Sequence, residues 1–217
     1  MVVAAVADQK QKQKPAGRPR DPEIRKRVLL AAQRVYVRAG SSGISFEAVA
    51  REAAVGKPAI YRRWASSQEL MHDVLSSHAL VPDRSSQGNI GTVLRAIAMS
   101  SLRLVHSEEG AFILRMSSER GLHPELFNQY FERVGNVIHS QNRALIVEAI
   151  SRSELAEDCN PDILIQTITG SALVSSLMGF SVPPEQDEEA AVRYCDDLVS
   201  QLLRGVSSDP SSAARTA

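Results

Sequence analysis

The segment from Val55 to Trp64, VGKPAIYRRW, gathers cationic side chains and a phenol within a few residues. An ammonium such as that of Lys57 and a guanidinium such as that of Arg62 bind phosphates or the edges of guanine bases. The hydroxyl of Tyr61 can donate to a phosphate, and its ring can pack on a thymine methyl. The small side chain of Ala59 leaves room for a close approach of the backbone. These residue types indicate binding to a nucleic acid.

Helical spacing separates these polar side chains from two apolar ones. In a helix, Ile60 and Trp64 lie one turn apart and face the preceding part of the chain. Pro58 and Arg62 lie on roughly the opposite side. The pattern therefore predicts an anchored inner face and an outer face free to bind, although the solvated end of an amphipathic helix has the same pattern.

The histidines and cysteines form no pattern typical of catalysis or metal binding. None has metal-ligand spacing, no glycine-rich loop of the phosphate-binding type is present, and neither cysteine stands in a motif. We therefore expect no enzymatic activity, no cofactor and no metal site. The residues concerned are His72, His78, His106, His123, His139, Cys159 and Cys195.

Charge is distributed unevenly along the 217 residues, although the net charge is zero. Residues 1–80 hold 14 Lys and Arg against 7 Asp and Glu, whereas residues 81–217 hold 11 against 18. The basic part suits a polyanion that the acidic part would repel. Chance segregation of the charges is the alternative.

Composition also bears on location. The two cysteines form no disulfide framework, no apolar run approaches the ~18 residues of a membrane span, and the N-terminus lacks the features of a signal peptide. We expect a soluble cytoplasmic protein that does not contact a membrane.

Capping residues predict how the basic segment is positioned. Ser45 would cap one short helix, Gly56 would open a second after a tight turn, and Ser66 with Glu69 forms the capping box of the next. Two short helices joined by such a turn describe a helix-turn-helix. The helices predicted in this part span 22–39, 45–53, 56–64 and 66–80.

The rest of the chain also reads as helical, with no strand pattern. We predict an all-α fold in which an N-terminal helix-turn-helix module precedes a second, larger helical module. The later helices are expected at 89–106, 109–119, 124–152, 161–180 and 186–205. The predicted divisions are a disordered basic arm (1–20), the helix-turn-helix domain (21–80), the second helical domain (81–206) and a disordered tail (207–217).

The stretch SFEAVAREAAVGKPAIYRRWASSQEL resembles the DNA-binding signature of TetR-type transcriptional regulators, and the match covers about residues 22–75. The resemblance implies a homodimer that places one short helix of each subunit in a major groove of double-stranded DNA. It also implies that residues 21–80 form a helix-turn-helix DNA-binding domain. Residues 81–206 would then form an all-helical dimerisation and effector-binding domain that senses a small-molecule effector.

Individual roles follow from this resemblance. The residues that match DNA-contacting positions of the family are Ser45, Lys57, Pro58, Ala59, Tyr61 and Arg62. The sequence departs from the family pattern at three positions: Ser67 replaces a usual lysine, Gly56 a usual serine cap, and Ala54 a usual turn glycine.

The basic arm contains the sequence GRPR at 17–20. Arg18 and Arg20, on either side of a proline, suit a minor groove beside the main site. A solubilising tail is the alternative.

Two further sets of residues are predicted in the C-terminal module. A partner subunit would cover an apolar face of the last two helices, although burial within one subunit explains the same pattern; this set is Ile168, Ala172, Leu173, Leu177, Leu198 and Leu202. An effector would lie among the helices at 89–152, where an apolar stripe also fits plain core; this set is Met99, Leu102, Arg103, Phe112, Arg115, Met116, Phe127 and Phe131.

The sequence thus predicts a ligand-responsive repressor that binds a near-palindromic operator as a homodimer. An activator, or a regulator without an effector, is the alternative within DNA binding. A helical dimeric ligand-binding or scaffold protein, whose basic N-terminus does not read DNA sequence, is the alternative from another class.

Overall fold

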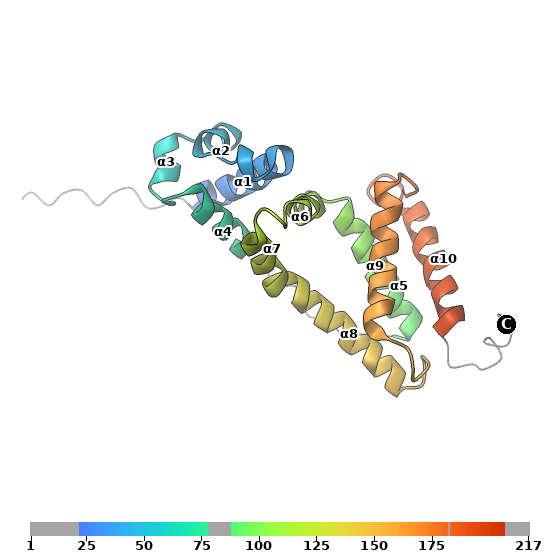
Figure 1. The fold of residues 1–217 in the computed structure, drawn as a ribbon. Coiled ribbons are helices and arrows are strands. Elements are labelled where there is room, and N and C mark those ends of the chain that lie inside the picture. The colour runs from blue at the N-terminus through green and yellow to red at the C-terminus, as the bar shows by residue number, and fades with distance from the viewer. Residues whose placement is uncertain (1–21, 78–87, 182, 207–217) are drawn as a thin grey trace, which may run out of the picture.

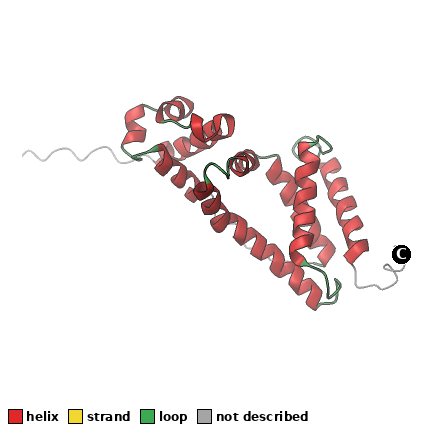
Figure 2. Cartoon of the chain, viewed as in Figure 1, coloured by secondary structure: helices red, strands yellow, loops and turns green. Residues whose placement is uncertain are grey.

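The computed structural model describes residues 22–77, 88–181 and 183–206. These residues are helical and contain no strand, which confirms the predicted all-α class (Figure 2). The elements are α1 (Pro22–Gly43), α2 (Phe46–Glu52), α3 (Lys57–Tyr61), α4 (Ser67–Ser77), α5 (Ile90–Val105), α6 (Glu108–Ser118), α7 (Pro124–Tyr130), a π-helical segment η1 (Phe131–Gly135), α8 (Asn136–Ser151), α9 (Pro161–Leu177) and α10 (Glu188–Val206).

Local capping explains most helix starts. The side chain of Asn89 accepts the N–H of Thr92 at the start of α5, and Ser107 accepts the N–H of Gly110 at the start of α6. The side chain of Asn160 caps α9. Pro161 follows at the first helical position, where an N–H would have no partner within the helix, so proline is tolerated there. The predicted arm (1–20) and tail (207–217) lie outside the described residues. So does the predicted module boundary at 81–88, apart from Gly88.

The predicted helix at 124–152 forms, but it is not α-helical throughout. The residues from Phe131 to Gly135 are π-helical and join α7 to α8 without a break. A Cβ at Gly135 would collide with the ring of Phe131, so the glycine allows the ring to lie against the backbone here. Such single-turn π segments have no strong sequence signature.

The buried side chains form two cores, one at each end of the molecule (Figure 1). The first core joins α1–α4 to residues from later in the chain, including Phe112 of α6 and Leu126 of α7. The second core lies among α5, α8, α9 and α10, with α5 packed against both α9 and α10. The long run from α7 to α8 connects the two (Figure 1). No helix in the described ranges is long and apolar enough to cross a membrane.

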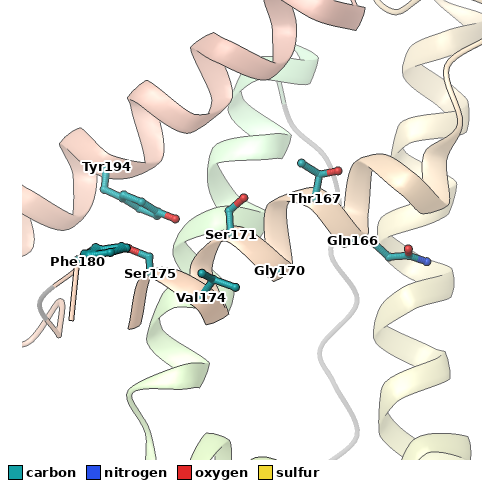
Figure 3. A pocket seen from close by; sticks show the side chains of 8 residues that line it. All are labelled: Gln166, Thr167, Gly170, Ser171, Val174, Ser175, Phe180 and Tyr194. Carbon is teal, nitrogen blue, oxygen red and sulfur yellow. The ribbon is translucent and has the colours of Figure 1, made fainter. Parts of the chain in front are cut away.

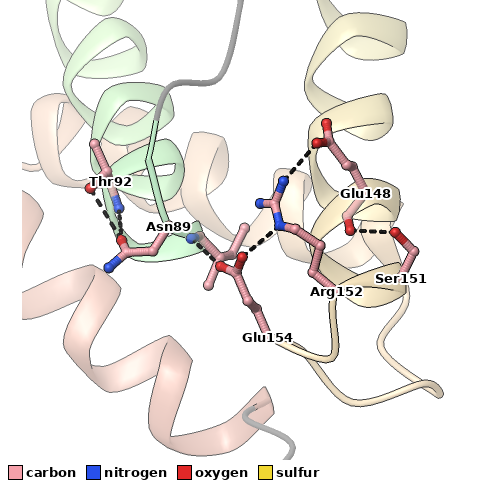
Figure 4. A network of polar contacts seen from close by, with 7 residues as sticks. Asn89, Thr92, Glu148, Ser151, Arg152 and Glu154 are labelled. Atoms are coloured by element: carbon pink, nitrogen blue, oxygen red, sulfur yellow. Dashed lines mark hydrogen bonds and ion pairs between the residues drawn. The ribbon is translucent and has the colours of Figure 1, made fainter.

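A polar network fixes the far end of the second core (Figure 4). The carboxylate of Glu154 accepts the N–H of Ile90 at 2.6 Å and a hydrogen bond from Arg152, also at 2.6 Å. Arg152 in turn donates to Glu148 near the end of α8. The bond from the Ile90 amide and the bond from Arg152 hold the pKa of Glu154 below its usual value. The network therefore ties the start of α5 to the end of α8.

A second polar contact links α1 to α6. Gly40 has a φ of 67°, so the backbone turns out of the regular α1 helix there, as the sequence predicted. The following N–H, that of Ser41, donates to the Glu119 carboxylate at 2.9 Å, and Arg115 pairs with the same carboxylate at 2.9 Å. A Cβ at position 40 would collide with both side chains, so only glycine fits. The first four helices are thus fixed to α6 by a buried carboxylate.

Candidate nucleic-acid interface

The turn between α2 and α3 has the hydrogen bonds of a Schellman motif. The N–H of Val55 donates to the carbonyl of Ala50 at 3.0 Å, and that of Ala54 donates to Arg51 at 3.3 Å. Ala54 has a φ of 51°, the left-handed conformation that this motif requires and that glycine usually supplies. The chain therefore makes the turn despite the alanine, and Gly56 starts α3 without a side-chain cap.

Buried residues hold α3 in place. Ile60 is fully buried and Trp64 is 4% exposed, which confirms the predicted inward face. The Trp64 indole N–H donates to the Asp73 carboxylate at 3.0 Å, and Arg25 of α1 pairs with the same carboxylate. The predicted cap is also confirmed, since Ser45 Oγ accepts the N–H of Ala48 at 3.1 Å. Helix α3 thus packs on α2, while Trp64 just after it is bonded to α4.

The predicted DNA-contacting residues of the helix-turn-helix lie at the surface. Tyr61 is 61% exposed, and its ring meets Phe46 edge-on with centroids 4.9 Å apart. Ser45 is exposed, and the cap does not use its hydroxyl proton, because the oxygen only accepts there. We call the six residues the reading surface: Ser45, Lys57, Pro58, Ala59, Tyr61 and Arg62, of which only Ala59 is partly covered.

An acidic residue beside the reading surface was not anticipated. Glu47, in the first turn of α2, forms an ion pair with Lys57, in the first turn of α3. Both side chains are more than half exposed, so the pair is screened by solvent and contributes little to stability. No sequence spacing identifies such a pair, because the turn between the helices decides which residues meet.

Three other predictions for this interface have different outcomes. Arg18 and Arg20 lie outside the described residues. Ser67, which replaces the lysine usual in the family, is partly covered at the start of α4. The predicted capping box forms in part: Ser66 accepts the N–H of Glu69, while the Glu69 carboxylate accepts the N–H of Ala65.

The structure does not bring the eight predicted effector residues together. Leu102 is fully buried in the second core, with Met99 packed against it, whereas Phe112 and Met116 are buried in the first core. Arg103 is exposed and pairs with Glu188 at 3.1 Å. The remaining three are Arg115, which holds Glu119, and Phe127 and Phe131, whose rings stack 5.7 Å apart with Phe131 47% exposed.

The predicted partner-binding face needs a correction. Ile168 and Ala172 are fully buried in their own subunit, between α9 and the rest of the second core, so they cannot meet a partner. Leu177 is 60% exposed, as a partner-binding residue should be. Leu173, Leu198 and Leu202 are partly covered.

An N-terminal helix-turn-helix with an exposed basic and aromatic surface, fixed to a larger helical module, defines the class of helix-turn-helix DNA-binding regulators. Residues 28–74 match the family of bacterial regulatory proteins named tetR. An uncharacterized HTH-type transcriptional regulator of Bacillus subtilis (strain 168), YdeS, is 26% identical over 193 residues, 88% of this chain and 93% of that protein. Residues 28–74 thus form a DNA-binding domain of the tetR type, and the chain is a DNA-binding transcriptional regulator.

Solved structures share the fold. The ketosteroid transcriptional regulator KstR2 of Mycobacterium tuberculosis matches with a TM-score of 0.61 and 16% identity, over 89% of this chain and 99% of that one. NalD of Pseudomonas aeruginosa, the secondary repressor of the MexAB-OprM multidrug efflux pump, matches with a TM-score of 0.58 and 19% identity, over 87% and 98%.

Proposed function

We propose that this regulator is a ligand-responsive repressor that binds a near-palindromic operator as a homodimer. The observation that carries the proposal is the exposed reading surface above the buried Ile60 and Trp64. Because these two buried side chains anchor α3, its exposed side chains keep one orientation, which the recognition of a DNA sequence requires. Because it would act on an operator, we propose that the protein works in the cytoplasm. We also propose that it has no enzymatic activity.

Each residue of the reading surface has a proposed role. Lys57 and Arg62 bind phosphates or guanine edges, and Tyr61 bonds a phosphate or packs on a thymine methyl. Ser45 donates its hydroxyl to a phosphate at the start of α2. Pro58 and Ala59 let the first turn of α3 approach the bases closely. In the complex a phosphate or base would replace Glu47 as the partner of Lys57.

A second copy of the chain is the proposed partner of α9 and α10. Three large apolar residues of α9, Ile163, Val174 and Leu177, are exposed on one face of the helix, opposite the residues in the second core. Exposed apolar side chains grouped on one face typically mark a protein interface. The stripe of α9 comprises these three residues together with Thr167, which is exposed, and Gly170, which is partly covered, at intervals of three and four along the helix.

The groove beside this stripe supports the same partner. It encloses about 640 Å³, and Tyr194 of α10 lies along it together with Phe180, Ser171 and Val174 (Figure 3). Gly170 leaves the backbone open there, since a Cβ at this position would meet no other atom. Two copies packed through α9 and α10 would set their reading surfaces about one DNA turn, ~34 Å, apart.

Release from DNA is proposed to follow a population shift. An effector that binds better to a conformation with misplaced reading surfaces lowers operator affinity by its differential affinity for the two conformations. The helical module around the second core, including Met99 and Leu102 of α5, remains the proposed place for that effector.

A selection experiment tests the proposed function. Purified protein is mixed with a random duplex pool at near-physiological salt, and the bound duplexes are sequenced. We expect an inverted repeat whose half-sites are one helical turn apart. Retention of duplexes without sequence preference would instead support a helical ligand-binding or scaffold protein with a merely basic N-terminus. Release of the selected duplex by a metabolite extract would support the effector, and activation of a reporter would contradict repression.

A further inference from the structure

The short segment after α3 carries the only tryptophan of the chain, and a residue of α4 holds it. The indole N–H of Trp64 donates to the Asp73 carboxylate at 3.0 Å. Helix α3 itself has five residues and packs on α2. An isolated helix of this length is not stable in water, so its direction depends on what fixes its two ends. The turn at Ala54 precedes the start of α3, and Trp64 ties the end of α3 to Asp73.

Both oxygens of the Asp73 carboxylate accept hydrogen bonds. One oxygen accepts the indole N–H of Trp64 and, at 3.1 Å, the Nε–H of Arg25. The other oxygen accepts from Nη2 of the same guanidinium. Two bonds from one guanidinium fix the plane of a carboxylate as well as its position. Arg25, near the start of α1, therefore holds the acceptor of the Trp64 indole in one orientation.

Asp73 also lies on a helix that is fixed from its other sides. The apolar face of α4 is buried in the first core. His72 contacts Gln129 of α7, and the hydroxyl of Ser76 accepts a hydrogen bond from Arg133 of η1 at 2.9 Å. The carboxylate of Asp73 can therefore serve as a fixed point for the end of α3.

Limited access of solvent strengthens this contact. Trp64 is 4% exposed, and the side chain of Asp73 is 25% exposed. Water competes weakly for groups at this depth, and a hydrogen bond to an ionised acceptor is stronger than one to a neutral acceptor. Removal of the carboxylate would leave the buried indole N–H of Trp64 and the guanidinium of Arg25 without the acceptor that they share.

We propose that Asp73 is a positioning residue for the recognition of DNA sequence. It fixes the end of α3 through the indole of Trp64, and the ion pair with Arg25 keeps the carboxylate oriented. The exposed side chains at that end of α3, Tyr61 and Arg62, then meet the base edges in one geometry, which direct readout requires. The proposal rests on the role proposed above for the reading surface.

The fluorescence of Trp64 tests the first step without DNA. Because the chain has one tryptophan, the emission of the full-length protein reports on this side chain alone. In the wild type, the anisotropy should decay only with the tumbling of the whole molecule. In Asp73→Ala, a faster component should appear, because side chains that are not held reorient within nanoseconds. In Asp73→Asn this component should be smaller, since the amide oxygen can still accept the indole N–H.

Glu52→Gln is the matched control. Glu52, the last residue of α2, pairs with Arg38 of α1, and its side chain is 24% exposed, close to the 25% of Asp73. The change removes a similar ion pair among the first four helices without touching a hydrogen bond of Trp64. It should leave the anisotropy decay as in the wild type. Urea unfolding of each variant shows that it is folded under the conditions used.

The specificity of DNA binding tests the second step. The operator from the random-pool selection is compared with the same duplex carrying one changed base pair, which typically weakens binding roughly five- to a hundredfold. In Asp73→Ala this ratio should fall by about threefold or more, because misplaced side chains distinguish bases poorly. The salt slope should not change, because no contact with a phosphate is lost. Asp73→Asn should lie between Asp73→Ala and the wild type, and Glu52→Gln should keep the full ratio.

Three results would overturn the proposal. A wild-type anisotropy decay in Asp73→Ala would show that burial alone holds Trp64. An unchanged ratio in the same variant would show that the bond does not serve sequence recognition. A salt slope steeper by about 1 would show that Asp73 acts by keeping Arg25 from a phosphate.

Two arrangements keep these outcomes separable. If Asp73→Ala does not fold, the comparison of Asp73→Asn with Glu52→Gln decides in the same way. If the selection yields no operator, the proposed reading surface is contradicted, whereas the anisotropy decay of Trp64 still tests the role of Asp73.

Discussion

The ammonium of Lys57 is paired with the carboxylate of Glu47, so the first turns of α2 and α3 are tied together at the reading surface. DNA must compete with this carboxylate for Lys57, and the carboxylate also repels phosphate. Glu47→Gln should therefore raise operator affinity roughly two- to fivefold. Lys57→Ala should weaken binding and reduce the salt slope by about 1. Titration of a fluorescent operator at several salt concentrations measures both.

A matched control for this prediction is Glu189→Gln. Glu189 is exposed in the first turn of α10 and pairs with Arg193, so the change removes the same charge far from α3. It should leave operator affinity unchanged. An equal gain in both variants would show that net charge, and not the pair with Lys57, sets the effect.

Tyr61→Ala should weaken operator binding by roughly ten- to a hundredfold, in line with the loss of one reading side chain. Because Tyr61 is 61% exposed, the fold should survive, with a loss of about 0.5–1.5 kcal/mol from the Phe46 contact. Tyr61→Phe keeps the ring and separates the hydroxyl from it. Wild-type affinity in Tyr61→Ala would refute the assignment of α3 as the helix that reads DNA.

Ala54→Gly should raise the free energy of unfolding by up to about 1 kcal/mol, because Ala54 has a φ of 51° that costs an alanine more than a glycine. Ala53→Gly is the control one residue earlier, where φ is −76° and glycine should destabilise. Urea unfolding measures both. Stabilisation by both changes, or by neither, would contradict the strain at Ala54.

Glu119 should make stability depend on pH in the acid range. Burial alone would raise its pKa, but the hydrogen bonds with Ser41 and the charge of Arg115 lower it below the usual 4.5. A carboxyl with a lowered pKa contributes stability in full above its unfolded value and loses it as pH falls through the folded value. The stability difference between wild type and Glu119→Gln should thus shrink below about pH 4.5, as measured by urea unfolding across pH. A constant difference would exclude this role.

Val174→Glu should convert dimers to monomers, since Val174 is 53% exposed in the middle of the apolar stripe on α9. Ile168→Glu, on the buried side of the same helix, should instead unfold the second core. Sedimentation velocity separates a folded monomer from an unfolded chain. A dimer in Val174→Glu would exclude α9 as the interface.

Local features of the sequence were enough to predict the helix-turn-helix. The cap at Ser45 and the inward placement of Ile60 and Trp64 depend on neighbours within a few residues, and both are confirmed. Helix α9 shows where such reasoning ends. It is apolar on both sides, so periodicity could not distinguish Ile168, which faces its own core, from Val174, which faces outward.

Contacts between distant residues could not be predicted in the same way. The bond from Ser41 to Glu119 spans 78 residues, and nothing near either residue indicates the other. The pair of Lys57 and Glu47 depends on the turn geometry at Ala54. The effector set failed to cluster because Phe112 and Met116 of α6 pack into the first core, although they follow α5 in the chain.

The first core also limits how the DNA-binding part can be exchanged among relatives. Phe112, Met116, Leu126, Tyr130 and Val134 complete that core, and all of them follow α5 in the chain. A fragment that ends at α4 would expose the apolar surface that these side chains cover. A chimera that borrows another regulator's first four helices therefore needs matching residues in α6, α7 and η1, so new operator specificity would be gained more easily by changing the reading surface alone.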